Sequence, residues 1–150
     1  MERARAASDR GPRRWLTVCL LVAGLLGGGR TATATPLATY LSQFVLMMDW
    51  VNRAIVYVPR HEADTDLADV AHAVAETLVE KSQRLTPPDE LRDLHPHFLL
   101  VLENAERAFH YLSQSDDEKA DRHMAVVRDE IRIMRQIQRE IGIEIPELAL

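Results

Sequence analysis

The sequence lacks the residues on which many crosslinked or catalytic small proteins depend. Cys19 is its only cysteine, which excludes a disulfide framework, a cysteine-based zinc site and haem attachment through a cysteine pair. No serine lies in a glycine-framed nucleophile elbow, and no glycine-rich loop of the kind that binds phosphate is present. We therefore assign no catalytic residue and expect a protein that is not an enzyme.

Positive charge is also scarce outside the N-terminal segment. Residues 1–34 contain six arginines and two acidic residues, whereas residues 35–150 contain twelve Lys and Arg against twenty-one Asp and Glu, a net charge of −9. Such an acidic body repels phosphate backbones, and no basic stripe with interleaved aromatic residues offsets this repulsion. The composition therefore argues against nucleic-acid binding.

Residues 1–34 have the pattern of an export signal peptide. An uncharged apolar run at 15–26 is followed by three glycines and by Ala32-Thr33-Ala34, and it is preceded by Arg3, Arg5, Arg10, Arg13 and Arg14. We expect cleavage after Ala34, an exported protein that is periplasmic or extracellular, and membrane contact only through this segment before cleavage. An uncleaved anchor is the alternative, although the run has about 12 residues where a span needs about 20.

Residues 35–150 have the periodicity of an all-α bundle. One stripe recurs at alternating steps of three and four residues and is formed by Leu91, Leu94, Phe98, Val101, Ala105, Ala108 and Leu112. The ranges 37–58, 67–85 and 124–141 carry stripes of the same period. Because the connections are short, adjacent helices should be antiparallel, which predicts an up-down-up-down four-helix bundle with a short C-terminal tail.

Helix boundaries are predicted from capping residues and prolines. The expected N-terminal caps are Thr35, then Asp64 or Thr65, then Thr86, and finally Ser115 in a capping box with Glu118. Gly142 is expected to end the fourth helix. Pro96 falls inside the third predicted helix, which should therefore kink or break near His95.

The first helix carries more apolar surface than one core can cover. Between Phe44 and Val51 it is apolar on nearly every side, and Leu46, Trp50 and Tyr57 fall opposite the core stripe. Such a surface is typical of a contact site, so these three residues are the predicted binding site for a protein partner or for a second copy. The alternative is that the tail from Ile143 to Leu150 covers this surface.

A cation site is a second candidate. Acidic residues gather before the second and fourth predicted helices, near three histidines: Glu62, Asp64, Asp66, Asp116, Asp117, Glu118 and Asp121, with His61, His110 and His123. Carboxylates and imidazoles are ligands for divalent cations. The same acids also stabilise helix N-termini, and no calcium loop with its central glycine is present. We therefore assign no metal ligand.

Haem or a di-metal centre is not favoured either. Met47 or Met48 with His123 would be about 6 residues, or about 9 Å, out of register across the bundle. The helical phase places His72 and His110 on outward positions, where they would not form a di-metal centre. The sequence therefore predicts no cofactor, and a metal- or haem-binding periplasmic bundle is kept as the alternative function.

The expected function is thus protein contact by an exported, non-enzymatic helical bundle. Self-association through the first helix and service as an accessory subunit at the cell envelope are both open at this point. No motif in the sequence distinguishes between these two roles.

Overall fold

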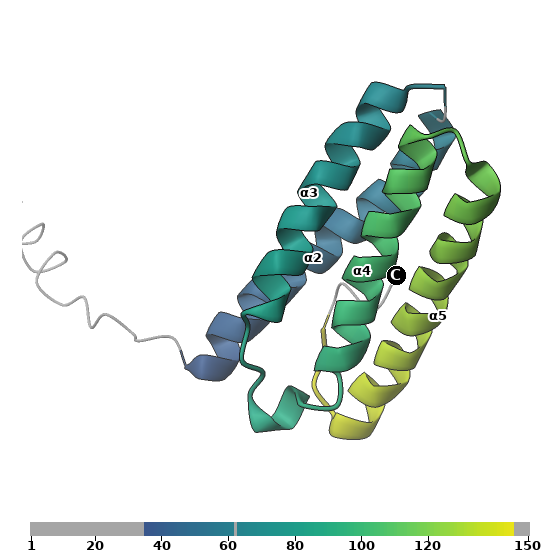
Figure 1. Cartoon of the computed structure of the whole chain (residues 1–150). Coiled ribbons are helices and arrows are strands. Elements are labelled where there is room, and N and C mark those ends of the chain that lie inside the picture. Colours follow the sequence, from purple (N-terminus) through teal and green to yellow (C-terminus); the bar gives the residue numbers. More distant parts are fainter. Residues whose placement is uncertain (1–34, 62, 146–150) are drawn as a thin grey trace, which may run out of the picture. The chain divides into compact units, whose positions relative to one another are not determined.

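The computed structural model describes residues 35–61 and 63–145, so the predicted signal segment and its cleavage point lie outside the described residues. This part of the chain is helical and contains no strand. Its four α-helices and two short 3₁₀ turns are α2 (Pro36–Tyr57), η1 (Val58–His61), α3 (Thr65–Gln83), η2 (Asp89–Leu91), α4 (His95–Ser113) and α5 (Asp117–Ile141). The arrangement is consistent with the predicted four-helix bundle (Figure 1).

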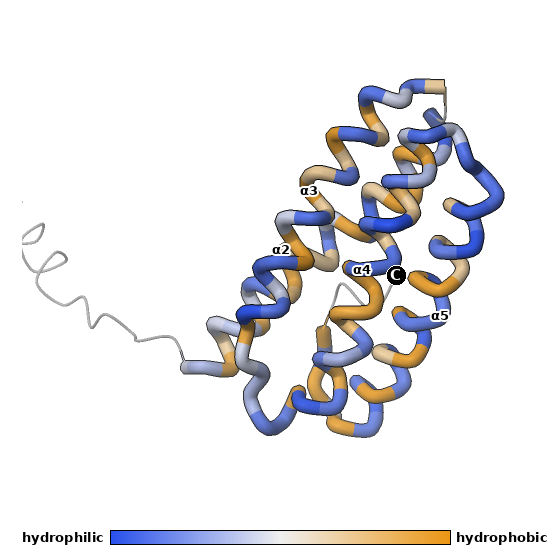
Figure 2. Tube along the Cα trace, viewed as in Figure 1, coloured by the Kyte–Doolittle hydropathy of each residue, from blue (hydrophilic) through white to orange (hydrophobic). Residues whose placement is uncertain are grey.

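The four helices are not equally close to one another. Helix α4 lies between α3 and α5 and packs closely against both, whereas α2 crosses behind α3 and α4 at a greater distance (Figure 1). The colours of Figure 1 show that successive helices run in opposite directions. Polar and apolar residues alternate along each helix with the helical period, as expected for amphipathic helices that share a core (Figure 2). No described helix is both long and apolar enough to cross a membrane.

Two of the predicted N-terminal caps are confirmed. The Thr35 hydroxyl accepts a hydrogen bond from the Ala38 backbone N–H at 3.2 Å, and the Asp64 carboxylate accepts one from the Leu67 N–H at 3.0 Å. Each bond satisfies a backbone donor that has no partner inside its helix.

The predicted cap of the fourth helix is wrong by one residue. Asp116, rather than Ser115, caps α5 and accepts the Lys119 backbone N–H at 3.2 Å. Ser115 has a φ of 56°, in the left-handed region, whereas Asp116 has the non-helical backbone with negative φ (−101°) that a capping residue adopts. The predicted stop is confirmed, because Gly142 ends α5 with a φ of 70°.

The start of the third helix also differs from the prediction. The chain after Thr86 does not enter a helix directly; it forms the short η2 turn, and α4 begins only at His95. Pro96 therefore lies in the first turn of α4, where its missing N–H costs nothing, and the expected break replaces an internal kink. Leu91 and Leu94 precede the helix, yet both are fully buried.

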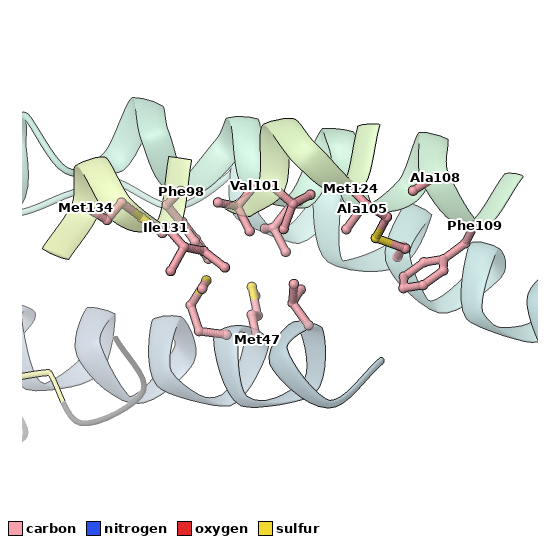
Figure 3. Close-up of a cluster of buried hydrophobic side chains, with 14 of the residues drawn as sticks. Met47, Phe98, Val101, Ala105, Ala108, Phe109, Met124, Ile131 and Met134 are labelled. Atoms are coloured by element: carbon pink, nitrogen blue, oxygen red, sulfur yellow. The ribbon is translucent and has the colours of Figure 1, made fainter. Parts of the chain in front are cut away.

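The apolar stripe of α4 forms the centre of the core. All seven residues of the predicted stripe are buried, and the Phe98 ring packs against Phe44 of α2 with 4.5 Å between ring centroids. Met47 reaches from α2 toward side chains of α4 and α5 (Figure 3). Long side chains of this kind let α2 fill the core from a distance.

The core is wider than the predicted heptad stripes. Buried residues outside those stripes include Tyr40, Met47, Leu102 and Phe109. Ile145, beyond the end of α5, is 1% exposed and belongs to the same core, so the chain folds back onto the bundle at least to this residue. Residues 146–150, the rest of the predicted tail, lie outside the described residues.

We expect Phe98→Ala to lower the free energy of unfolding by about 3–5 kcal/mol, because it removes a fully buried ring and leaves a cavity against Phe44. Urea denaturation followed by circular dichroism measures this change. Leu100→Ala is the control on the same helix: because Leu100 is 39% exposed, this substitution should lower the free energy of unfolding by only about 1 kcal/mol. A loss well below about 1 kcal/mol for Phe98→Ala would contradict the central position of this ring.

Candidate functional site

The three residues of the predicted contact face differ in exposure. Leu46 and Tyr57 are exposed, at 70% and 56% of their surface. Trp50 does not point outward as the helical phase predicted: it is half-buried, and its ring meets Phe109 of α4 edge-on with 5.8 Å between centroids. Trp50 lies at the boundary of the core because α4 lies beside this flank of α2. One edge of the indole therefore supports the fold and the other borders the surface.

An apolar groove of about 250 Å³ begins at Trp50 and runs between α2 and α3. We call it the α2–α3 groove. It is lined by Trp50, Arg53, Ala54 and Tyr57 of α2, by Val58, and by Leu67, Val70, Ala71 and Val74 of α3. Ala54 and Ala71 carry only a methyl group, so the two helices leave a hollow between the larger side chains on either side.

Charge is nearly absent from the α2–α3 groove. Arg53 is the only charged residue of its lining, and its Nε donates to Asp49 Oδ1 at 3.0 Å. Both side chains of this pair are largely exposed, so the pair contributes little to stability and the guanidinium is free to find another partner.

Val70 is a surface residue that the sequence analysis did not identify. Its side chain is 63% exposed on the α3 side of the groove. The sequence feature that could have identified Val70 is its apolar side chain at a position outside the core stripe of the second helix.

Histidines connect α4 to the other three helices. Four histidines form hydrogen bonds between helices: Tyr40 Oη with His95 Nδ1 at 2.8 Å, His72 Nε2 with Glu106 Oε1 at 2.8 Å, His97 Nδ1 with Glu130 Oε2 at 2.7 Å, and His123 Nδ1 with Asn104 Oδ1 at 2.9 Å. Each bond has one partner on α4 and the other on a different helix. The imidazoles thus act as polar links at the edge of the core.

The prediction that His72 and His110 face outward is wrong. Both are half-buried, and their rings lie 5.0 Å apart between α3 and α4. The positions that flank a core stripe face the neighbouring helix when that helix packs closely, as α3 does against α4.

Burial changes the protonation of two of these links. It lowers the pKa of His95, and it raises the pKa of Tyr40 far above its ordinary value, so that residue stays a neutral hydroxyl. Burial also lowers the pKa of His123, and the nearby Arg107 and Arg122 lower it further. Both imidazoles therefore favour the neutral form.

Asn104 is buried, and both polar atoms of its side-chain amide form a hydrogen bond. Its amide Nδ2 donates to the Leu100 carbonyl at 2.8 Å, which leaves Oδ1 to accept a hydrogen bond from His123 Nδ1 at 2.9 Å. The proton of neutral His123 accordingly lies on Nδ1.

The acidic residues before α3 and α5 serve the helix termini. Asp64 and Asp116 are the caps, and hydrogen bonds from the side chain and backbone of Lys119 lower the pKa of Asp116. Glu62 lies outside the described residues.

The three histidines named with these acids do not meet at one point. His61 packs on Tyr57, His110 on His72, and His123 bonds to Asn104. Within residues 35–61 and 63–145, no group of three or more His, Cys, Asp or Glu side chains is placed to hold a metal ion. Met47 and Met48, the methionines considered as haem ligands, are buried in the core.

Comparison of the chain with protein-family models, curated proteins and solved structures finds no match.

Acidification should weaken the fold through His95 and His123. Because both pKa values are lower in the folded protein than the ordinary value of about 6.5, the unfolded chain binds more protons as the pH falls below that value. The contribution of these residues is therefore fully present above about pH 6.5 and is lost on acidification. We expect the free energy of unfolding, measured in urea, to fall between about pH 7.5 and about pH 5.

The control for this prediction is the double variant His95→Gln, His123→Gln. The groups facing the two imidazoles are Tyr40 and Phe98 at His95, and Asn104, Tyr111, Glu106, Arg107 and Arg122 at His123. None of these groups changes in the variant, so its free energy of unfolding should depend less on pH. An unchanged dependence would contradict the assignment.

Proposed function

We propose that the protein is an exported, non-enzymatic, up-down-up-down four-helix bundle that acts through protein contact at the α2–α3 groove. The observation that carries this proposal is an apolar groove lined by the exposed side chains of Tyr57 and Val70, with the exposed Leu46 one helical turn before Trp50 on the same helix. Leu46 and Tyr57 belong to the contact site inferred from the sequence, and Trp50 forms part of the groove lining.

The exposed side chains favour binding on physical grounds. Covering one large apolar side chain contributes about 1.5–3 kcal/mol, so a partner that covers three of them gains a useful share of its binding energy. Aromatic residues and arginine are the side chains most often responsible for binding energy at interfaces, and Trp50, Tyr57 and Arg53 all line the groove. An apolar groove between two helices suits a helical partner.

Export is supported by the basic, apolar and small-residue order of residues 1–34. The mature part of the chain would then have no cysteine, and its stability would come from helix packing alone. A protein of this kind acts at the cell envelope or outside the cell.

Photocrosslinking in the producing cells tests the proposal. A photoreactive benzoyl-phenylalanine is placed at position 46 or 70 of the full-length chain, and at position 126 as the control, since Val126 is an exposed residue of α5 away from the groove. We expect crosslinked products at positions 46 and 70 well above those at 126, because a bound partner covers only the first two.

A second comparison uses a photoreactive residue at position 57. Leu46→Glu and Val70→Glu should each abolish its crosslinks, because a charge at the groove opposes burial. Val56→Glu is the matched control: Val56 is 49% exposed, lies about 100° around α2 from Tyr57 and does not line the groove. Equal crosslinking at all positions, or equal effects of all three substitutions, would show that the groove is not a contact site.

A further inference from the structure

The contact face of α2 carries both a projecting side chain and a hollow. Leu46 is the most exposed of the large apolar side chains and does not line the α2–α3 groove. It lies one helical turn before Trp50, where the groove begins. Its own groove therefore cannot receive Leu46, whereas the groove of another molecule can.

The residues along this face of α2 have the same sequence spacing in both chain directions. Leu46, Trp50, Arg53 and Tyr57 are separated by four, three and four residues, so they share one side of α2. A second α2 packed antiparallel, with the two-fold axis between residues 51 and 52, places Leu46 opposite Tyr57 and Trp50 opposite Arg53. Each pairing then occurs twice.

The two pairings are chemically complementary. Leu46 meets the ring of Tyr57 beside Val70 at the groove, which is apolar on both sides. Arg53 meets the half-buried indole of Trp50, and a guanidinium over an indole face is a favourable cation–π contact. The exposed pair of Arg53 with Asp49 does not prevent this, because Asp49 precedes Trp50 and offers its carboxylate to the incoming guanidinium.

The charge distribution also favours contact through α2. Residues 35–150 carry a net charge of −9, so two copies repel one another over most of their surface. Helix α2 contains only two charged residues, Asp49 and Arg53, which are of opposite sign. This helix is therefore a face that two acidic chains can bring together without like-charge repulsion.

We infer that the occupant of the α2–α3 groove is a second copy of this chain, packed antiparallel through α2 so that each Leu46 enters the groove of the other molecule. This inference rests on the proposed contact function and names its partner. Since the same surface is used by both molecules, the contact is isologous and the assembly closes as a dimer.

Disulfide crosslinking in the full-length chain tests the arrangement. Cys19→Ser removes the only native cysteine, and chains carrying Leu46→Cys are mixed with chains carrying Tyr57→Cys. We expect a rapid disulfide between the two kinds of chain, since a disulfide needs Cα atoms within about 7 Å. Leu46→Cys alone is the control: the antiparallel pairing separates its two copies by about 16 Å, whereas a parallel pairing brings them together.

Sedimentation of the full-length chain measures the association itself. We expect a dimer whose dissociation constant rises by about tenfold or more with Leu46→Glu or Val70→Glu and does not change with Val56→Glu. Circular dichroism checks that each variant keeps its helix content. We expect no loss of helix content in these variants, because all three positions are exposed.

The outcomes separate this inference from the proposed function. A concentration-independent monomer, or a 46–46 disulfide in place of 46–57, overturns the antiparallel dimer. A crosslink from position 46 to a different protein, or to residues 1–34 or 146–150 of the same chain, also overturns it. A crosslink to a different protein, or a 46–46 disulfide, leaves the contact function standing, whereas absence of any crosslink at the groove removes both.

Discussion

Burial of one face of α4 is the interaction on which the rest of the structure depends. The apolar stripe that ends at Leu112 is withdrawn from water along its whole length, and its centre is the contact of Phe98 with Phe44. Small buried residues, such as Ala105 within the stripe of α4 and Ala75 of α3, let α3 and α5 approach closely, while α2 fills the remaining side with long side chains. Hydrophobic burial therefore places α4 in the middle and determines what each other helix contacts.

The polar contacts follow from that central position. A helix with neighbours on both flanks has many half-buried positions, and a side chain there must be large enough to reach across and polar enough to bond. Imidazole meets both needs, and His72, His97 and His123 each take a partner across an interhelical boundary. Asn104 lies in the core and also needs polar partners. Its buried amide forms hydrogen bonds with the Leu100 carbonyl and with His123.

The contact surface is a consequence of the position of α2. Helix α2 crosses behind α3 and α4, so one side of it is in the core, and no other helix of the described residues lies against the opposite side (Figure 1). Its apolar residues exceed what the core can cover, which leaves Leu46 and Tyr57 exposed, and α3 completes a groove beside them. The proposed contact site therefore lies on the helix that packs least closely against the others.

The sequence by itself determined the four helices, the stripe of α4, the cap Thr35, the choice of Asp64 or Thr65 as the cap of α3, and the stop at Gly142, because periodicity and capping depend on residues within a few positions of one another. Tertiary structure decided that Trp50 turns toward Phe109, that His72 meets Glu106 and that Val70 joins the groove. Each of these outcomes depends on which helix lies beside a given flank. That choice is made by contacts between residues far apart in the chain, about which helical periodicity contains no information.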